Sequence, residues 1–442
     1  MTKLLLGIIL LIHAFILTKL IFFPYPELFI YPYLINHGLK PYSQILDQHF
    51  PGLMFLPLNF DNLGLTNEIS ARVWLIAIVL ITHLFLFIIS RKILKNDYKA
   101  LLVNLLYLIW QPFFEGWVLW IDNFLPLLVL PAFYFLYKKK FLVTGILLGL
   151  GIVFKQTLIP LSLLVLIFVL WENKNQARRY LVGLCIPVIP MLLYFAAIGV
   201  LVDFWYWTVV FNLTVYAKTG TQIPNNFAFI SRVLVVYISS LSGLLSSDRR
   251  LKIILSLFLI GSLAGAFDRA NFVHFQPSLP FVVILTSLGF YSLNKKKIGL
   301  VLIGVYILIT LWWQNIFYKG HLSSQIFFFD QSTYAVAGKI MQYTKPNDKI
   351  FVYGAAPHLY QMSQTLPAGD IFVFQFPWFL KIAEDRILEG IKKDQPQIIV
   401  SDRTVEIEGD QITSFAKKID QYIVENYEKI DNVGDTEILR RK

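Results

Sequence analysis

Residues 70–89 read SARVWLIAIVLITHLFLFII. About 20 apolar residues in a helix are needed to cross the roughly 30 Å hydrocarbon layer of a membrane. This segment has that length, and it is followed at once by Arg91, Lys92 and Lys95. Lysine and arginine gather on the cytoplasmic side of membrane proteins. The stretch therefore predicts a membrane-spanning helix whose C-terminal end faces the cytoplasm.

Ten further apolar segments resemble this one. They are residues 4–23, 100–114, 123–137, 141–154, 157–171, 180–200, 229–245, 251–267, 275–293 and 298–318. If every cationic cluster stays inside, the chain forms about eleven transmembrane helices, with its N-terminus in the cytoplasm and its C-terminal part outside. We interpret 4–23 as a retained span because it is long and has no small-residue cleavage site.

The four predicted spans between residues 100 and 171 are unusually short. Each has about 14 or 15 residues, which gives roughly 22 Å of helix at 1.5 Å per residue. One long helix over residues 141–171 would place the cationic clusters at 138–140 and 178–179 on opposite sides of the membrane, against the charge rule. Two shallow hairpins fit the lengths and the charge rule better. Their tips, at 115–122 and 155–156, are expected near the outer membrane surface, where irregular backbone must face protein or water.

The composition excludes an ordinary soluble enzyme. Of the 442 residues, 56% are hydrophobic and 15% are charged, too few charged residues to cover a water-soluble surface of this size. The net charge of +11 arises in residues 1–319, which hold 25 lysines and arginines against 11 acids. This excess marks membrane topology, and we expect no nucleic-acid partner. Cys185 is the only cysteine, so a disulfide framework is excluded.

The sequence changes character near residue 331. Helices are predicted at 333–343, 377–393 and 411–427, and strands at 349–353 and 397–400. About 110 residues are enough for a separate core. We therefore divide the chain at residue 319, with a transmembrane domain before it and an extracytoplasmic α/β domain, 320–442, after it.

Most acids of the apolar part fall on the predicted outer face. They are Glu27, Asp47, Asp61, Glu68, Glu115, Asp122, Asp203 and Asp268. The sequence contains no GxGxxG, P-loop, HExxH or GxSxG motif. An enzyme on this face would have no ATP or nucleotide sugar to use, so it would need a donor held in the membrane.

Three outer acids are candidates for chemistry. Glu27 ends the stretch FPYPE, residues 23–27, where a partly buried carboxylate could accept a proton from a hydroxyl; it could equally be a solvated loop acid. Asp47 lies two residues before His49, which adds a second titratable group. Asp122 lies near the hydrocarbon, where ionisable residues are often functional, although capping a helix is an equally good explanation.

Three basic residues could bind an anion. Lys155 lies in an apolar hairpin, and Arg269 and His274 lie on an outer connection. Together they could hold a phosphate group. The alternatives are a lysine that reaches the surface, an ion pair between Asp268 and Arg269, and a histidine at the membrane boundary.

Several stretches resemble the GT-C fold membrane glycosyltransferases, the group of protein mannosyltransferases and aminoarabinose transferases. In the outer loop these are the acid after the first span, HGLKPY at 37–42 and DQHFPG at 47–52. The Lys155-Gln156 pair, residues 269–280 and KIFVYG at 349–354 also match. The resemblance covers nearly the whole chain. It implies that residues 1–319 form a transmembrane glycosyltransferase domain whose outer loop, 24–69, contains the active site.

The resemblance also implies a reaction. A sugar on a polyprenyl phosphate would be the donor, and a hydroxyl of a lipid, glycan or protein the acceptor, in one inverting displacement. By this resemblance Glu27 and Asp47 are catalytic, and either of them could be the base. Lys155, Arg269 and His274 would bind the donor phosphate. The residues implied to position the substrate are Asp122, His49, Gln156 and Tyr42. No metal or other cofactor is required, although two nearby carboxylates could hold a divalent ion.

Two other classes of protein fit parts of the sequence. A lipid or solute transporter of the cell envelope would use the outer charges as a binding site, but it should also have polar residues near the membrane midplane. A scaffold for envelope assembly would not need acids and cations to converge. For each class, the predicted location is the plasma or inner membrane, in contact with membrane lipid.

Overall fold

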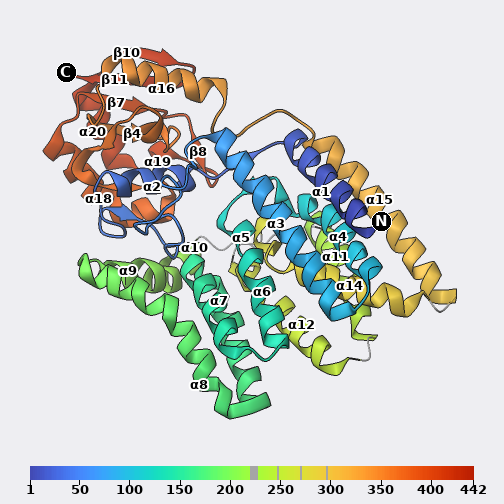
Figure 1. The fold of residues 1–442 in the computed structure, drawn as a ribbon. Helices are drawn as coiled ribbons and strands as arrows, with labels where there is room; N and C mark the ends of the chain where they lie inside the picture. The colour runs from blue at the N-terminus through green and yellow to red at the C-terminus, as the bar shows by residue number, and fades with distance from the viewer. Residues whose placement is uncertain (220–226, 246–247, 269–270, 295–296) are drawn as a thin grey trace. The chain divides into compact units, whose positions relative to one another are not determined.

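The computed structural model describes residues 1–219, 227–245, 248–268, 271–294 and 297–442 (Figure 1). The chain forms two compact units. The first contains residues 1–23, 71–192 and 221–325, and the second contains 24–70, 193–220 and 326–442. The predicted division at residue 319, between a transmembrane glycosyltransferase domain and an extracytoplasmic domain, stays a prediction.

The first unit is built from helices. Those wholly or mostly within it are α1 (Thr2–Lys19), α3 (Glu68–Leu94), α4 (Asp97–Gln111), α5 (Ile121–Phe124), α6 (Pro126–Tyr137), α7 (Phe141–Phe154), α8 (Ile159–Ala197), α11 (Phe227–Leu241), α12 (Arg249–Ser262), α13 (Ala264–Asp268), α14 (Leu279–Leu293) and α15 (Lys297–His321). Short turns join them: the π-helix η1 (Pro112–Gly116), the 3-10 helices η2 (Gln156–Leu158), η4 (Ser242–Leu245) and η5 (Phe272–Phe275), and the two-residue strands β1 (Phe23–Pro24) and β3 (Val118–Leu119).

Helices occur at each of the eleven predicted segments. Within the described ranges, five helical stretches are long and apolar enough to cross a membrane: Thr2–Lys19, Glu68–Leu94, Gln156–Ala197, Phe227–Leu245 and Lys297–His321. The backbone leaves helical geometry at Asn173, so α8 consists of two arms that correspond to the predicted segments 157–171 and 180–200. The chain is a membrane protein; the number of crossings and their direction stay predictions.

Glycines allow α7 and the second arm of α8 to pack closely. A Cβ atom on Gly145 would lie 2.2 Å from the Tyr180 carbonyl oxygen, and one on Gly149 would lie 2.5 Å from that of Leu184. From the other side, a Cβ atom on Gly183 would lie 2.2 Å from a backbone oxygen of α7. Such small residues let helix backbones approach in membranes, where the hydrophobic effect does not drive helices together.

Replacing Gly145 by valine should therefore push these helices apart. We expect the free energy of unfolding to fall by about 1–3 kcal/mol, the usual cost of overpacking, seen as a lower melting temperature in detergent. Gly304→Val is the matched control, because Gly304 also lies in an apolar helix but has nothing within 4 Å of its added Cβ atom. Equal melting temperatures for the two variants would contradict the close packing.

The second unit combines the outer loop with an α/β segment. Its helical elements are α2 (Glu27–Asn36), α9 (Leu201–Trp205), the π-helix η3 (Tyr206–Tyr216), α10 (Ala217–Thr219), α16 (Gln331–Tyr343), α17 (Leu359–Met362), the 3-10 helix η6 (Ala368–Asp370), α18 (Pro377–Asp394), α19 (Ile412–Phe415) and α20 (Lys417–Asn426). Its strands are β2 (Ile45–Leu46), β4 (Lys349–Tyr353), β5 (Leu366–Pro367), β6 (Phe372–Val373), β7 (Ile398–Ser401), β8 (Glu406–Ile407), β9 (Asp410–Gln411), β10 (Tyr427–Val433) and β11 (Thr436–Arg441).

A five-stranded sheet forms the centre of the α/β segment, in the order β10-β11-β7-β4-β5. Strand β4 is parallel to β5 and to β7, whereas β11 runs antiparallel to β7 and to β10. Helix α16 packs against β10 and β11, and α18 packs against α20. The predicted strand 349–353 and the predicted helices 333–343 and 377–393 are confirmed. The predicted helix 411–427 is wrong as one element, because the backbone leaves helical geometry at Ala416.

The outer loop packs against this α/β segment inside the second unit. Strand β2 pairs in parallel with β6, which places Ile45 opposite Phe372. In α2, the ring of Tyr31 contacts the rings of Phe372 and Phe374 edge-on. Helix α2 therefore lies among elements that are more than 300 residues away in the chain (Figure 1).

A buried histidine makes the stability of the second unit depend on pH. His358 is fully buried, and its Nε2–H donates to the Phe328 carbonyl oxygen at 2.7 Å. Burial lowers the pKa of His358 from 6.5 to about 4, although the Asp330 charge acts the other way. Between these two pH values the unfolded chain binds the proton and the folded chain does not. The contribution of neutral His358 to the free energy of unfolding is thus complete above pH 6.5 and is lost as the pH falls towards 4.

We expect the wild type to lose roughly 3 kcal/mol of unfolding free energy from this group between pH 7 and pH 4. His358→Gln should remove that share of the pH dependence, whereas replacing the exposed His37 by glutamine should not. Denaturant unfolding of the full-length protein in detergent at several pH values measures the difference. If the free energy of unfolding changes with pH equally in the wild type and in His358→Gln, His358 does not titrate in this way.

Candidate functional site

A cluster of acids forms in the outer loop of the second unit. Helix α2 begins at Glu27, and Tyr31 lies one turn later on the same helix face. The Tyr31 hydroxyl is fully buried and donates to Asp47 Oδ2 at 2.6 Å. Burial, then the charges of Asp47 and Glu27, raise the pKa of Tyr31 well above its usual range. Tyr31 is therefore a neutral donor near two carboxylates.

Asp47 and His49 form a hydrogen-bonded pair. The backbone N–H of His49 lies 2.7 Å from Asp47 Oδ1, and its ring Nδ1 lies 2.9 Å from the same oxygen. Asp47 is 2% exposed, whereas the His49 side chain is 26% exposed. With Tyr31 included, the Asp47 carboxylate accepts three hydrogen bonds. It thus fixes the orientation of the more accessible imidazole.

Tyr42 supports His49. Its hydroxyl donates to the His49 carbonyl oxygen at 3.0 Å, and its ring packs edge-on against Phe195 and Phe204. Tyr42 has a φ of 62°, a left-handed conformation that is uncommon for a bulky side chain. The structure therefore brings together four of the predicted residues, Glu27, Tyr42, Asp47 and His49, within the second unit.

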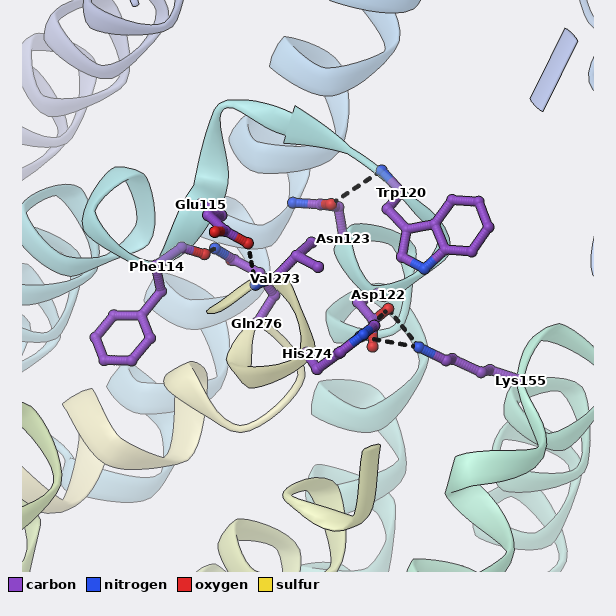
Figure 2. Close-up of polar contacts among 9 residues, drawn as sticks. All are labelled: Phe114, Glu115, Trp120, Asp122, Asn123, Lys155, Val273, His274 and Gln276. Atoms are coloured by element: carbon purple, nitrogen blue, oxygen red, sulfur yellow. Dashed lines mark hydrogen bonds and ion pairs between the residues drawn. The ribbon is translucent and has the colours of Figure 1, made fainter. Parts of the chain in front are cut away.

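A second polar cluster lies in the first unit (Figure 2). Lys155 Nζ is 2.5 Å from Asp122 Oδ2 and 3.2 Å from His274 Nδ1. His274 Nδ1 is 3.0 Å from the same Asp122 oxygen. Asp122 is 1% exposed and Lys155 is 5% exposed. Breaking such a buried ion pair is costly, because one charge would remain without compensation.

The structure decides between the alternatives for two members of this cluster. Asp122 does not cap its helix: the Trp120 N–H donates to Asn123 Oδ1 at 3.2 Å, while Asp122 points towards Lys155 (Figure 2). Lys155 does not extend to the surface, because it is buried and paired. The other oxygen of Asp122, Oδ1, is buried and has no hydrogen-bond partner among the described residues.

Two further predicted residues are Gln156 and Arg269. Gln156 directly follows Lys155 and begins the 3-10 helix η2. Arg269 lies outside the described residues, so its predicted role is neither supported nor opposed. In the ranges that the structure describes, no group of three or more His, Cys, Asp or Glu side chains could hold a metal ion.

Glu115 and Gln276 fix the segment that contains His274. Glu115 Oε2 accepts the Val273 N–H at 3.0 Å, and Gln276 Nε2 donates to the Phe114 carbonyl oxygen (Figure 2). Gln276 Nε2 also donates to the carbonyl oxygen of Gln111. Burial raises the pKa of Glu115 above its usual range, against the opposing effects of the Val273 bond and a nearby arginine. Neither Glu115 nor Gln276 is among the predicted site residues.

The arginine near Glu115 is Arg232, which is not among the predicted site residues either. Its guanidinium carbon lies 4.2 Å from the ring centre of Phe113 and 3.9 Å from that of Phe272. Nε and Nη2 are buried without a hydrogen-bond partner in the described part of the chain. Its position inside the predicted span 229–245 could have identified it from the sequence, because ionisable residues within a membrane are costly and often functional.

The solved structures that are similar to this chain include two with TM-scores above 0.5. One is ArnT from Cupriavidus metallidurans bound to undecaprenyl phosphate, with a TM-score of 0.66 and 12% sequence identity, over 99% of this chain and 97% of that chain. The other is the oligosaccharyltransferase from Archaeoglobus fulgidus in complex with zinc and sulfate, with a TM-score of 0.51 and 12% identity, over 93% of this chain and 70% of that chain. The chain has the GT-C fold.

No protein-family model matches the sequence, and no curated protein matches it either. The GT-C fold is thus evident from the backbone although the residues have diverged. Because the ArnT alignment covers 99% of this chain, the GT-C likeness includes both the helical unit and the unit with the outer loop.

Proposed function

We propose that the chain is a membrane glycosyltransferase. It would move a sugar from a polyprenyl phosphate to an acceptor hydroxyl at the outer membrane face, with inversion at the anomeric carbon. The observation that supports this most is the likeness, over 99% of the chain, to a protein crystallised with undecaprenyl phosphate. The two buried polar clusters provide the acids and cations that such a reaction needs.

The proposed role of the cluster in the first unit is to bind the donor phosphate. Lys155 and His274 would stabilise the charge that develops on phosphate as the glycosyl bond breaks, with Arg269 as a third cation. Asp122 would hold Lys155 in place before the donor arrives. Preorganised charges of this kind lower a barrier by roughly 3–4 kcal/mol per group.

The proposed role of the outer-loop cluster is to activate the acceptor. Asp47 already accepts three hydrogen bonds, which suits an orienting group better than a proton acceptor. Glu27 is our choice for the base that removes the hydroxyl proton. His49, oriented by Asp47, is the second choice. Tyr42 and Gln156 would position substrate, and the proposal requires no metal ion.

The enzyme is proposed to lie in the plasma or inner membrane with eleven spans and its C-terminal part outside. The acceptor would be a lipid, glycan or protein. Incubation of the purified protein in lipid nanodiscs with a panel of polyprenyl-phosphate sugars, together with lipid, glycan and peptide acceptors that carry free hydroxyls, tests the function. Consumption of one donor with release of free polyprenyl phosphate is the expected result. If every donor stays intact and one instead crosses the membrane of a reconstituted vesicle, the protein is a flippase and the proposal is wrong.

A further inference from the structure

A cavity of about 540 Å³ lies in the first unit, away from the residues discussed so far. Its walls are Phe168, Trp171, Glu172, Arg249, Arg250 and Ile253. Glu172 ends the first arm of α8, and the arginines begin α12. Asp122 precedes α6 and Tyr137 ends it, so the cavity lies at the other end of that helix, roughly 20 Å from Asp122 at 1.5 Å per residue.

Arg250 connects α8, α6 and α12 at this end of the first unit. It donates to both carboxylate oxygens of Glu172, at 2.7 and 3.1 Å. It also donates to the last carbonyl oxygens of α6, those of Leu136 and Tyr137, at 3.0 and 2.6 Å. Helices α6 and α12 pack against each other (Figure 1). These four contacts occupy the guanidinium, so Arg250 is a structural part of the cavity wall.

The charge around the cavity is not balanced by protein groups. Glu172 is its one acid, and that carboxylate is shared between Arg250 and Lys139, whose Nζ lies 3.5 Å away. Arg249 is exposed and has no ion-pair partner among the described residues. Positive charge therefore remains available at the edge of the cavity.

The cavity also has an apolar part. Phe168, Trp171 and Ile253 line it, and Trp171 is 69% exposed on the surface of a membrane protein. Tryptophan is enriched at the level of the lipid headgroups. A soluble phosphate compound would leave these apolar side chains uncovered, whereas an amphipathic ligand would contact both the charged and the apolar residues of the lining.

We propose that this cavity binds an anionic glycerophospholipid. Arg249 contacts the headgroup phosphate, and an acyl chain lies along Phe168, Trp171 and Ile253. Basic pockets between transmembrane helices bind lipid headgroups in this manner. The predicted topology places the site on the cytoplasmic side, where anionic lipids are abundant. The inference does not depend on the proposed glycosyl transfer.

Lipid titration of the purified full-length protein tests the proposal. Delipidated protein in detergent is mixed with phosphatidylglycerol or with phosphatidylcholine of the same acyl chains, and bound lipid is counted by native mass spectrometry. The wild type should retain phosphatidylglycerol in preference to phosphatidylcholine. Arg249→Gln should weaken phosphatidylglycerol binding roughly fivefold, the effect of one basic residue at a lipid surface.

Lys252→Gln is the matched control, because it removes the same charge one turn along α12 without lining the cavity. It should bind both lipids as the wild type does. Equal losses in the two variants, or no loss in Arg249→Gln, would overturn the proposal. A third titration with undecaprenyl phosphate separates the ligand classes: if Arg249→Gln weakens that lipid and not phosphatidylglycerol, the assigned class is wrong.

Discussion

Glu27→Gln is expected to lower the rate of sugar transfer by about 10²–10⁴-fold, the usual contribution of a general base. Glutamine has the same shape as glutamate but accepts no proton, and residue 27 occupies the first turn of α2 in either case. Donor binding and the melting temperature should stay close to those of the wild type. Loss of donor and release of polyprenyl phosphate, followed over time in nanodiscs, give the rate.

Controls distinguish the base from its neighbours. Glu68→Gln removes another outer acid, one that accepts a hydrogen bond from the Tyr334 hydroxyl at 2.5 Å, and it should transfer sugar at the wild-type rate. His49→Gln should retain more activity than Glu27→Gln. If instead Glu27→Gln is active and His49→Gln is not, the Asp47–His49 pair provides the base and our assignment is wrong.

Asp122→Asn is expected to destabilise the protein by about 3–5 kcal/mol, because Lys155 would stay buried without its carboxylate. Its transfer activity should also be lost, since Lys155 and His274 would no longer be held for the donor phosphate. A double variant, Asp122→Leu with Lys155→Met, removes both charges and should recover most of the lost stability. It should remain inactive.

Melting temperatures and transfer rates of the wild type, Asp122→Leu, Lys155→Met and the double variant form a complete cycle. A coupling free energy near zero would show that the 2.5 Å contact between Asp122 and Lys155 contributes nothing to stability. Transfer by the double variant at a wild-type rate would remove both residues from the proposed mechanism, whatever their effect on folding.

The sequence predicted the elements whose residues alone determine them. A long apolar run such as 70–89 can cross a membrane only as a helix. Strand 349–353 has the continuous apolar pattern of a buried strand. Strands β10 and β11 were missed, because YEKIDNV and TEILRR contain few apolar residues. Their structure comes mainly from antiparallel pairing with each other and of β11 with β7, which no local pattern reveals.

The candidate residues were predictable one by one, but most of their partners were not. Asp122 and Lys155 are 33 residues apart in sequence, and His274 is 152 residues from Asp122. Only packing of the helices can place them together. Asp47 and His49 are a local exception, since two residues of loop suffice for their contact. Arg232 was overlooked, although its position in an apolar segment was visible.

The pairing of β2 with β6 has a consequence for how the protein matures during synthesis. Glu27 and Asp47 of the outer loop emerge from the ribosome among the first fifty residues, yet the strand and the aromatic rings that pack against this loop come after residue 370. The helices can enter the bilayer one after another, but this loop stays without its native neighbours until translation is almost finished. A message that stops near codon 330 would thus give a protein whose outer loop lacks both β6 and these aromatic rings.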